Sequence, residues 1–195
     1  MNGFPYGSVL SWRVPPDKNK FFTRVFGKLQ LIFTGRKETH SSILLDKTID
    51  DKYYEFESSK TTRIALFEGN EYVNIFDIKA PEQIKREIIN ELIKEEFGKI
   101  YGLVQTVYFV FRWFMEKLHI DVRRWINPFG FLSICSKLVY LYLLRLSLKM
   151  EWDDLTMFLL KWNKNTCHSG DIRIILNFMV GKDYAEHILK SINED

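Results

Sequence analysis

The chain has 195 residues, and at about 150 residues per domain this length predicts one domain with a core large enough to fold without disulfides. Its 10 glycines and 5 prolines are too few for a collagen-like or low-complexity chain. The net charge of +3 is too small to predict a nucleic-acid partner, and we expect none.

The two cysteines, Cys135 and Cys167, lie far apart in the sequence. They form neither a disulfide framework nor a zinc-ligand spacing, so a reducing compartment is expected. The first residues lack the basic and apolar regions of a signal peptide. The apolar stretch Phe129 to Leu148 is interrupted by Lys137 and Arg145, which argues against a transmembrane helix. We expect a cytoplasmic protein, or one carried by a virus or phage.

The first half of the chain predicts one helix and a set of strands. Residues 7–12 read as a short strand, and apolar residues at a spacing of three and four predict a helix from about Asp17 to Gly35. Four β-like runs follow at intervals of roughly 10 residues, which is typical of an antiparallel meander. These runs are 40–45, 53–57, 63–67 and 72–76.

The second half predicts helices. Pro81 is typical of a first helical position, and Gly98 follows the apolar stripe as a stop. A second, aromatic helix is expected over 103–118, and a third over 135–148. Ser133 is a suitable N-cap for the third helix. One or two more helices are expected over 151–190. Helix, strands and then helices predict the α+β class, with an antiparallel sheet packed against helices.

Cys135 is the first candidate for chemistry because it lies in the first turn of a predicted helix. The helix dipole and the free N–H groups of that turn favour a thiolate, and the same N–H groups can hold an oxyanion. The alternative is that Cys135 is a buried small hydrophobic residue at a helix start.

His40 and Glu55 are candidates for the base and for the group that orients it. His40 opens one predicted strand, and Glu55 lies on the next strand. Side chains on adjacent antiparallel strands can meet on one face, where a carboxylate would stabilise the charged imidazole. Glu57 shares that face with Glu55, so either carboxylate is compatible with the pattern.

Five segments resemble, in the same order, motifs of the circularly permuted papain-like cysteine hydrolases. This group contains the YiiX-like relatives of NlpC-type peptidases and of lecithin–retinol acyltransferase. The segments are Phe33-Thr-Gly-Arg-Lys-Glu-Thr-His40-Ser-Ser, Tyr54-Glu55-Phe56, Phe97-Gly-Lys-Ile-Tyr101-Gly, Ile134-Cys135-Ser-Lys-Leu-Val-Tyr140 and Asn165-Thr-Cys167-His-Ser-Gly-Asp-Ile172.

The resemblance implies a permuted papain-like fold and a hydrolase with a thiol nucleophile. Cys135 would attack an amide, of a peptide or of peptidoglycan, with His40 as base and Glu55 as the third residue of the triad. Tyr101 and Ser136 would contact the substrate or the oxyanion. Neither a metal nor an organic cofactor is implied.

The chain departs from the family pattern at several positions. Lys137 stands where an acidic residue is frequent, Ser8 follows Gly7 where an Asp is usual, and Cys167 replaces a proline. Lys137 matters to the chemistry only if it points toward Cys135, where it would favour the thiolate. The changes leave open a catalytically silent structural or interaction protein on the same fold.

The expected organisation is a single domain over 1–195 with two additions. An aromatic helical insert at about 105–128 would cap the active site or contact a membrane or another protein, and a helical extension would occupy about 173–195. The insert keeps a lipid acyl hydrolase or acyltransferase as the alternative activity. The remaining histidines, His119, His168 and His187, read as surface or cap residues.

Overall fold

The computed structural model confirms the α+β class. It describes residues 4–13, 38–47, 52–58, 61–67, 73–99, 111–112, 114–120, 135–162, 164 and 167–188. The strands are β1 (Val9–Arg13), β2 (Glu38–Lys47), β3 (Tyr53–Ser58), β4 (Thr62–Leu66), β5 (Val73–Ile78) and β6 (Ala185–Ile188). The helices with defined bounds are α2 (Glu82–Glu96), α4 (Cys135–Lys149), α5 (Asp153–Leu159) and α6 (Ser169–Gly181).

The strands form one six-stranded antiparallel sheet in the order β4-β3-β2-β1-β5-β6. The predicted meander is correct for β2, β3 and β4. It is wrong for β5, which pairs with β1 and not with β4. The first strand thus enters the middle of the sheet, and β2 lies between β1 and β3.

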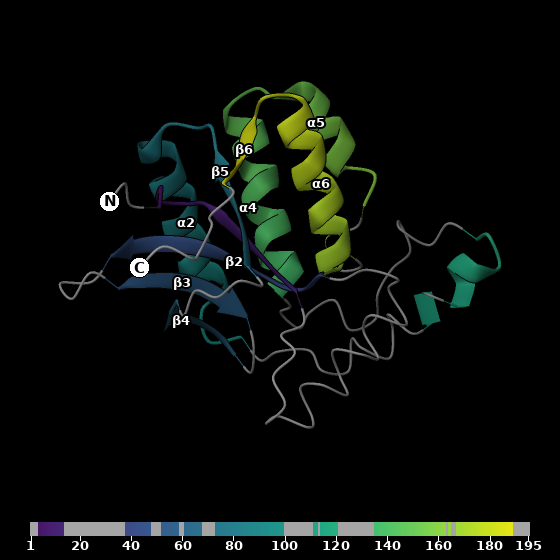
Figure 1. Cartoon of the computed structure of the whole chain (residues 1–195), viewed down its shortest axis with the longest axis horizontal. Coiled ribbons are helices and arrows are strands. Elements are labelled where there is room, and N and C mark those ends of the chain that lie inside the picture. Colours follow the sequence, from purple (N-terminus) through teal and green to yellow (C-terminus); the bar gives the residue numbers. More distant parts are fainter. Residues whose placement is uncertain are drawn as a thin grey trace.

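The helices cover one face of this sheet (Figure 1). Helix α4 packs on β2 and contacts α2, α5 and α6. Side chains of alternate strand positions, such as Val9, Ile43 and Phe56, meet the apolar side of α4 there and are fully buried. Each such side chain stabilises the fold by roughly 1.5–3 kcal/mol. The other face carries a smaller apolar cluster around Leu10 and Leu44. The side chains of His40, Glu55 and Glu57 lie on this second face.

The expected helical extension is only partly correct. Helix α6 lies in the core, where Ile172, Ile175 and Leu176 are fully buried. After it Asp183 adopts a φ of 61°, and the chain turns back to add β6 to the free edge of β5. A strand at 185–188 therefore replaces the helix expected there.

Several expectations fall on residues that the structure does not describe. These are the helix at 17–35, the N-cap Ser133 and most of the expected insert at 105–128. Within that insert, residues 111–112 and 114–117 are helical, as predicted.

Gly7 fixes the start of β1 against α4. Its φ is +75°, and a Cβ added there would lie 2.6 Å from Oη of Tyr142 and 2.8 Å from Cδ of Lys85. The Tyr142 hydroxyl, fully buried on α4, donates to the Gly7 carbonyl at 2.8 Å. Both the left-handed backbone and the close approach require glycine at this position.

We expect Gly7→Ala to destabilise the protein more than Gly98→Ala. Gly98 has a similar φ of +78°, but a Cβ there meets nothing within 4 Å. Gly98→Ala should cost about 1–2 kcal/mol for the left-handed backbone alone, and Gly7→Ala about 1–3 kcal/mol more for the steric overlap. Urea unfolding of both variants measures the difference, and equal losses would show that Tyr142 and Lys85 yield without cost.

Candidate active site

Cys135 is the first residue of α4 and is 4% exposed. The register of the sheet leaves a backbone N–H, that of Ser41, to donate a hydrogen bond to the Cys135 sulfur. Backbone N–H groups alternate sides along a strand, and because the N–H of Leu44 donates toward β1, the N–H of Ser41 points toward β3. The pairs between β2 and β3 run only from Ile43 and Phe56 toward the hairpin. The Ser41 N–H is therefore available, and it donates to the Cys135 sulfur.

His40 lies close enough to Cys135 for their side chains to form a hydrogen bond. Burial disfavours the imidazolium, but the Cys135 thiolate and a nearby carboxylate outweigh it and raise the pKa of His40 to about 10. Burial likewise disfavours the thiolate, but the charge and hydrogen bond of His40 lower the pKa of Cys135. The two groups thus stabilise each other as a thiolate and an imidazolium.

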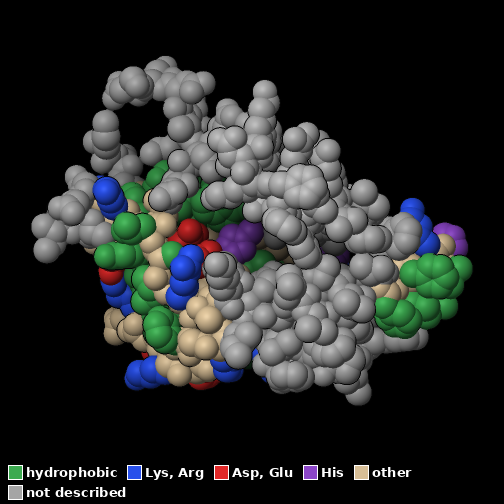
Figure 2. Space-filling model, turned by 90° about the horizontal axis from the view of Figure 1, so that it is seen from below, with side chains coloured by type: hydrophobic (Ala, Val, Ile, Leu, Met, Phe, Trp, Pro, Cys, Tyr) green, Lys and Arg blue, Asp and Glu red, His purple; other side chains and the backbone are tan. Residues whose placement is uncertain are grey.

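The carboxylate against the imidazole belongs to Glu57. Its Oε2 lies 3.2 Å from Nε2 of His40, and its Oε1 accepts from Arg63 on β4 at 2.9 Å. The contact with Nε2 is an ion pair rather than a well-aligned hydrogen bond. Because Nε2 faces Glu57, Nδ1 is the ring nitrogen left for Cys135. Figure 2 shows a histidine beside acidic side chains on this face, with basic side chains next to them.

Glu55 does not occupy the position expected of it. It shares a face with His40 and Glu57, but its carboxylate accepts a hydrogen bond from Ser42. Burial, opposed by the Ser42 hydrogen bond and the charge of His40, raises the pKa of Glu55 to about 7. The register explains the difference: Glu55 pairs with Leu44, so Glu57 is the residue that comes level with Ser42, next to His40 on that face.

Neither residue expected to contact the substrate or oxyanion is placed there by the structure. Ser136 is 2% exposed, and its hydroxyl donates to the carbonyl of Cys167 at 2.6 Å, which ties α4 to the segment before α6. Tyr101 lies outside the described residues. The charge change at Lys137 does not bear on the thiol. Its ammonium is buried and lies 3.8 Å from Oε2 of Glu96 on α2.

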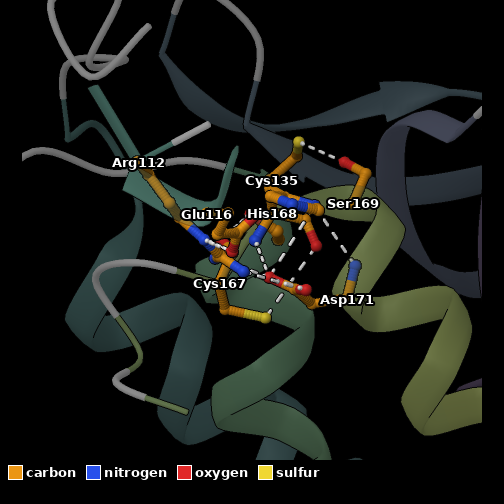
Figure 3. A network of polar contacts seen from close by, with 8 residues as sticks. Arg112, Glu116, Cys135, Cys167, His168, Ser169 and Asp171 are labelled. Carbon is orange, nitrogen blue, oxygen red and sulfur yellow. Dashed lines mark hydrogen bonds and ion pairs between the residues drawn. The ribbon is translucent and has the colours of Figure 1, made fainter. Parts of the chain in front are cut away.

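A polar network lies behind Cys135 at the start of α6 (Figure 3). His168 is the N-cap of α6, so the cap role expected of it is confirmed. Its Nδ1 accepts from the N–H of Asp171, and its own N–H donates to the Asp171 carboxylate at 3.0 Å. Arg112 donates two hydrogen bonds to the same carboxylate, at 2.8 and 3.3 Å. The first residue of α6, Ser169, has its hydroxyl 3.6 Å from the Cys135 sulfur.

Sequence reasoning missed two members of this arrangement, Ser169 and Arg112, and left the choice between Glu55 and Glu57 open. Glu57 was recognised as sharing the face of Glu55, but only the strand register shows which carboxylate meets His40. Ser169 and Arg112 carried no signal, because neither belongs to a spacing that predicts chemistry. The His168-to-Asp171 spacing, a polar residue and an acid three positions later, was the available sign that a helix begins beside the site.

No family model and no curated protein matches the chain. Among the described residues, no group of three His, Cys, Asp or Glu side chains is arranged to hold a metal ion. No described helix has the length and apolar character needed to cross a membrane.

We expect His40 to remain protonated to about pH 10, and Glu57→Gln to lower its pKa more than Glu55→Gln. Glu57 touches the ring, whereas Glu55 acts on it only through space. Removing a charge in contact should shift the pKa by about one unit or more. NMR titration of ¹⁵N-labelled imidazoles measures the pKa of His40 in wild type and in both variants. Equal shifts in the two variants would contradict the assignment of Glu57.

A second expectation concerns stability. Because folding raises the pKa of Glu55 from 4.5 to about 7, the folded state binds a proton more tightly between these values. The contribution of protonated Glu55 to stability is fully present below about pH 4.5 and is lost as the pH rises through about 7. The stability of Glu55→Gln relative to wild type should therefore rise by about 2–3 kcal/mol between pH 4.5 and pH 8.

Chemical denaturation at a series of pH values measures this difference. Glu87→Gln, at a half-exposed carboxylate of α2 that pairs with Lys149, is the control for loss of a surface charge. A constant difference between wild type and Glu55→Gln across the range would show that Glu55 is ionised at no cost.

Proposed function

We propose that the chain is a cysteine hydrolase in which Cys135 is the nucleophile, His40 the general acid and base, and Glu57 the residue that orients His40. The observation that supports this most directly is the series of contacts from Cys135 to His40 to Glu57, in which the pKa of the thiol is lowered and that of the imidazole is raised. Buried structural cysteines lack such partners, and their thiols become harder to ionise. Cys167 behaves in that second way, since burial raises its pKa well above the usual value.

The arrangement accommodates acyl transfer in two steps. The Cys135 thiolate attacks the carbonyl carbon, and the electron pair of the C=O bond moves to oxygen. Protonated His40 then gives its proton to the leaving amine or alcohol as that bond breaks, which leaves a thioester on Cys135. His40, now neutral, takes a proton from water. The hydroxide attacks the thioester, and loss of the acid restores the thiolate and imidazolium.

The oxyanion stabiliser that fits this scheme is the start of α4. Cys135 is the first helical residue, so its own N–H is one of the donors that the helix leaves unsatisfied. The Ser41 N–H, which donates to the sulfur, supports the thiolate in the resting enzyme.

The order of the parts supports a permuted papain-like fold. The base lies on a central strand of an antiparallel sheet, and the nucleophile begins a helix that packs on that strand, as in the family whose motifs the sequence resembles. The base also precedes the nucleophile in the chain, which is the permuted order.

An amide of a peptide or of peptidoglycan is the substrate class we propose first. A lipid acyl ester is the alternative, favoured by the helical residues 111–112 and 114–117. There Phe111 and Phe114 are 43% and 55% exposed, and Leu118 just beyond is 54% exposed. A membrane or an acyl chain would cover such side chains. Arg112 holds this stretch to Asp171 and thus close to the site.

We expect Cys135→Ala to reduce hydrolysis by at least about a thousandfold, since the nucleophile of such a triad cannot be replaced by water. The assay is a panel of peptide and muropeptide amides, together with acyl esters presented in vesicles. Cys167→Ala is the matched control, because it removes the other buried thiol without touching His40, and its activity should match wild type.

Two results would contradict the proposal. Hydrolysis that survives Cys135→Ala would exclude Cys135 as nucleophile. No turnover of any substrate, together with an ordinary Cys135 thiol, would favour a non-catalytic interaction protein on this fold. Turnover of vesicle esters alone would select the lipid alternative.

A further inference from the structure

The first residues of helices α4 and α6 meet at the sulfur atom of Cys135. Helix α4 begins at Cys135 and helix α6 begins at Ser169, and the Ser169 hydroxyl lies 3.6 Å from Sγ of Cys135 (Figure 3). We propose that Ser169 is a further catalytic residue, which donates its hydroxyl hydrogen to the Cys135 thiolate at the positive end of α6. The role rests on the proposed function of Cys135, but it concerns the thiolate itself and not any substrate.

The contact between Ser169 and the sulfur is buried. Ser169 is 1% exposed and Cys135 is 4% exposed, so water does not compete for the hydroxyl. In such surroundings a hydrogen bond to a charged atom is stronger than in water. The start of α6, a helix of 13 residues, adds a partial positive charge on the same side as the hydroxyl.

The second buried thiol shows what happens without such a donor. Cys167 is also fully buried, but its sulfur lies 3.9 Å from the carbonyl oxygen of His168, an acceptor. A thiol that faces a carbonyl must keep its proton in order to make that contact. Cys135 instead faces the hydroxyl of Ser169 and the N–H of Ser41, which are donors.

Asp171 would oppose this effect if its charge were not balanced. It lies in the first turn of α6, two residues after Ser169, and it is 4% exposed. Arg112, 3% exposed, binds its carboxylate through both terminal nitrogens and so offsets the negative charge near the thiolate. Arg112 is in this sense a positioning residue for Cys135, since it acts on the sulfur through Asp171.

Among the described residues, charged and titratable groups surround Cys135 on each packed element. They are His40 on β2, Glu55 and Glu57 on β3, Arg63 on β4, Cys167 and His168 before α6, and Asp171 with Arg112 and its second partner Glu116. Of these, His40 acts on the thiol directly, so the effect of Ser169 must be measured with His40 intact.

The test is the pH dependence of iodoacetamide alkylation at Cys135, read by mass spectrometry in the full chain. In Ser169→Ala the apparent pKa of Cys135 should rise by about one unit, so that alkylation slows by up to about tenfold at pH values below the wild-type midpoint. Ser169→Thr, which keeps the hydroxyl, should restore the wild-type profile. Ser147→Ala is the control for loss of a buried serine hydroxyl, because Ser147 bonds to Leu144 and Thr156 at the other end of α4.

Arg112 is tested by paired neutralisation. Arg112→Gln should raise the pKa of Cys135, because it leaves Asp171 unbalanced, and the double variant Arg112→Gln with Asp171→Asn should return it toward wild type. A merely structural role for Arg112 predicts that the double variant is at least as disturbed as the single one. Circular dichroism confirms that each variant is folded.

An unchanged Cys135 profile in folded Ser169→Ala would overturn the proposal. His40→Ala, measured in the same series, keeps this result separate from failure of the proposed function. If His40→Ala raises the pKa and Ser169→Ala does not, Cys135 and His40 stand as a pair and Ser169 has no part in it. If neither variant changes the profile, the thiolate itself is absent and both proposals fail.

Discussion

The contact between Cys135 and His40, in which each group favours the charged form of the other, is the interaction on which the rest of the site depends. Burial disfavours the charged form of both groups, so neither the thiolate nor the imidazolium would be stable without the other. Together they are stable, because the first residues of β2 run beyond the pairing with β3, which leaves His40 and the N–H of Ser41 to contact Cys135. A change in strand register by one residue would turn His40 to the other face and remove the partner of the thiolate.

Two carboxylates near the site, those of Glu57 and Asp171, are each paired with an arginine. Arg63 on β4 binds the oxygen of Glu57 that does not face His40, and Arg112 binds Asp171 at the start of α6. Glu55 has only a serine hydroxyl as its direct partner, and it is the carboxylate whose pKa is raised. Such pairs add little to stability compared with apolar packing. Their effect is to set which groups are ionised around the sulfur.

The elements that depend on local spacing were predictable, and the contacts that depend on pairing were not. The alternation of β2 and β3 and the apolar stripe of α2 identify those elements correctly. The same alternation places Glu55 and Glu57 on one face but leaves the choice between them to the register. Strand β6 could not be anticipated, because a run of four residues has no periodicity, and its pairing depends on the turn at Asp183 and the open edge of β5. Ser169 meets Cys135 only because α4 and α6 pack side by side.

The groups around the sulfur come from parts of the chain that are far apart in sequence. His40 and Glu57 come from the β2–β3 hairpin, and Cys135 and Ser169 come from helices near the other end of the chain. In the unfolded chain Cys135 has none of these partners, so its thiol is ordinary. Activation of the thiol is therefore a property of the complete fold, and it requires that α4 and α6 be seated on the sheet. Tyr142 and Gly7 contribute to this seating by joining α4 to the start of β1, away from the sulfur.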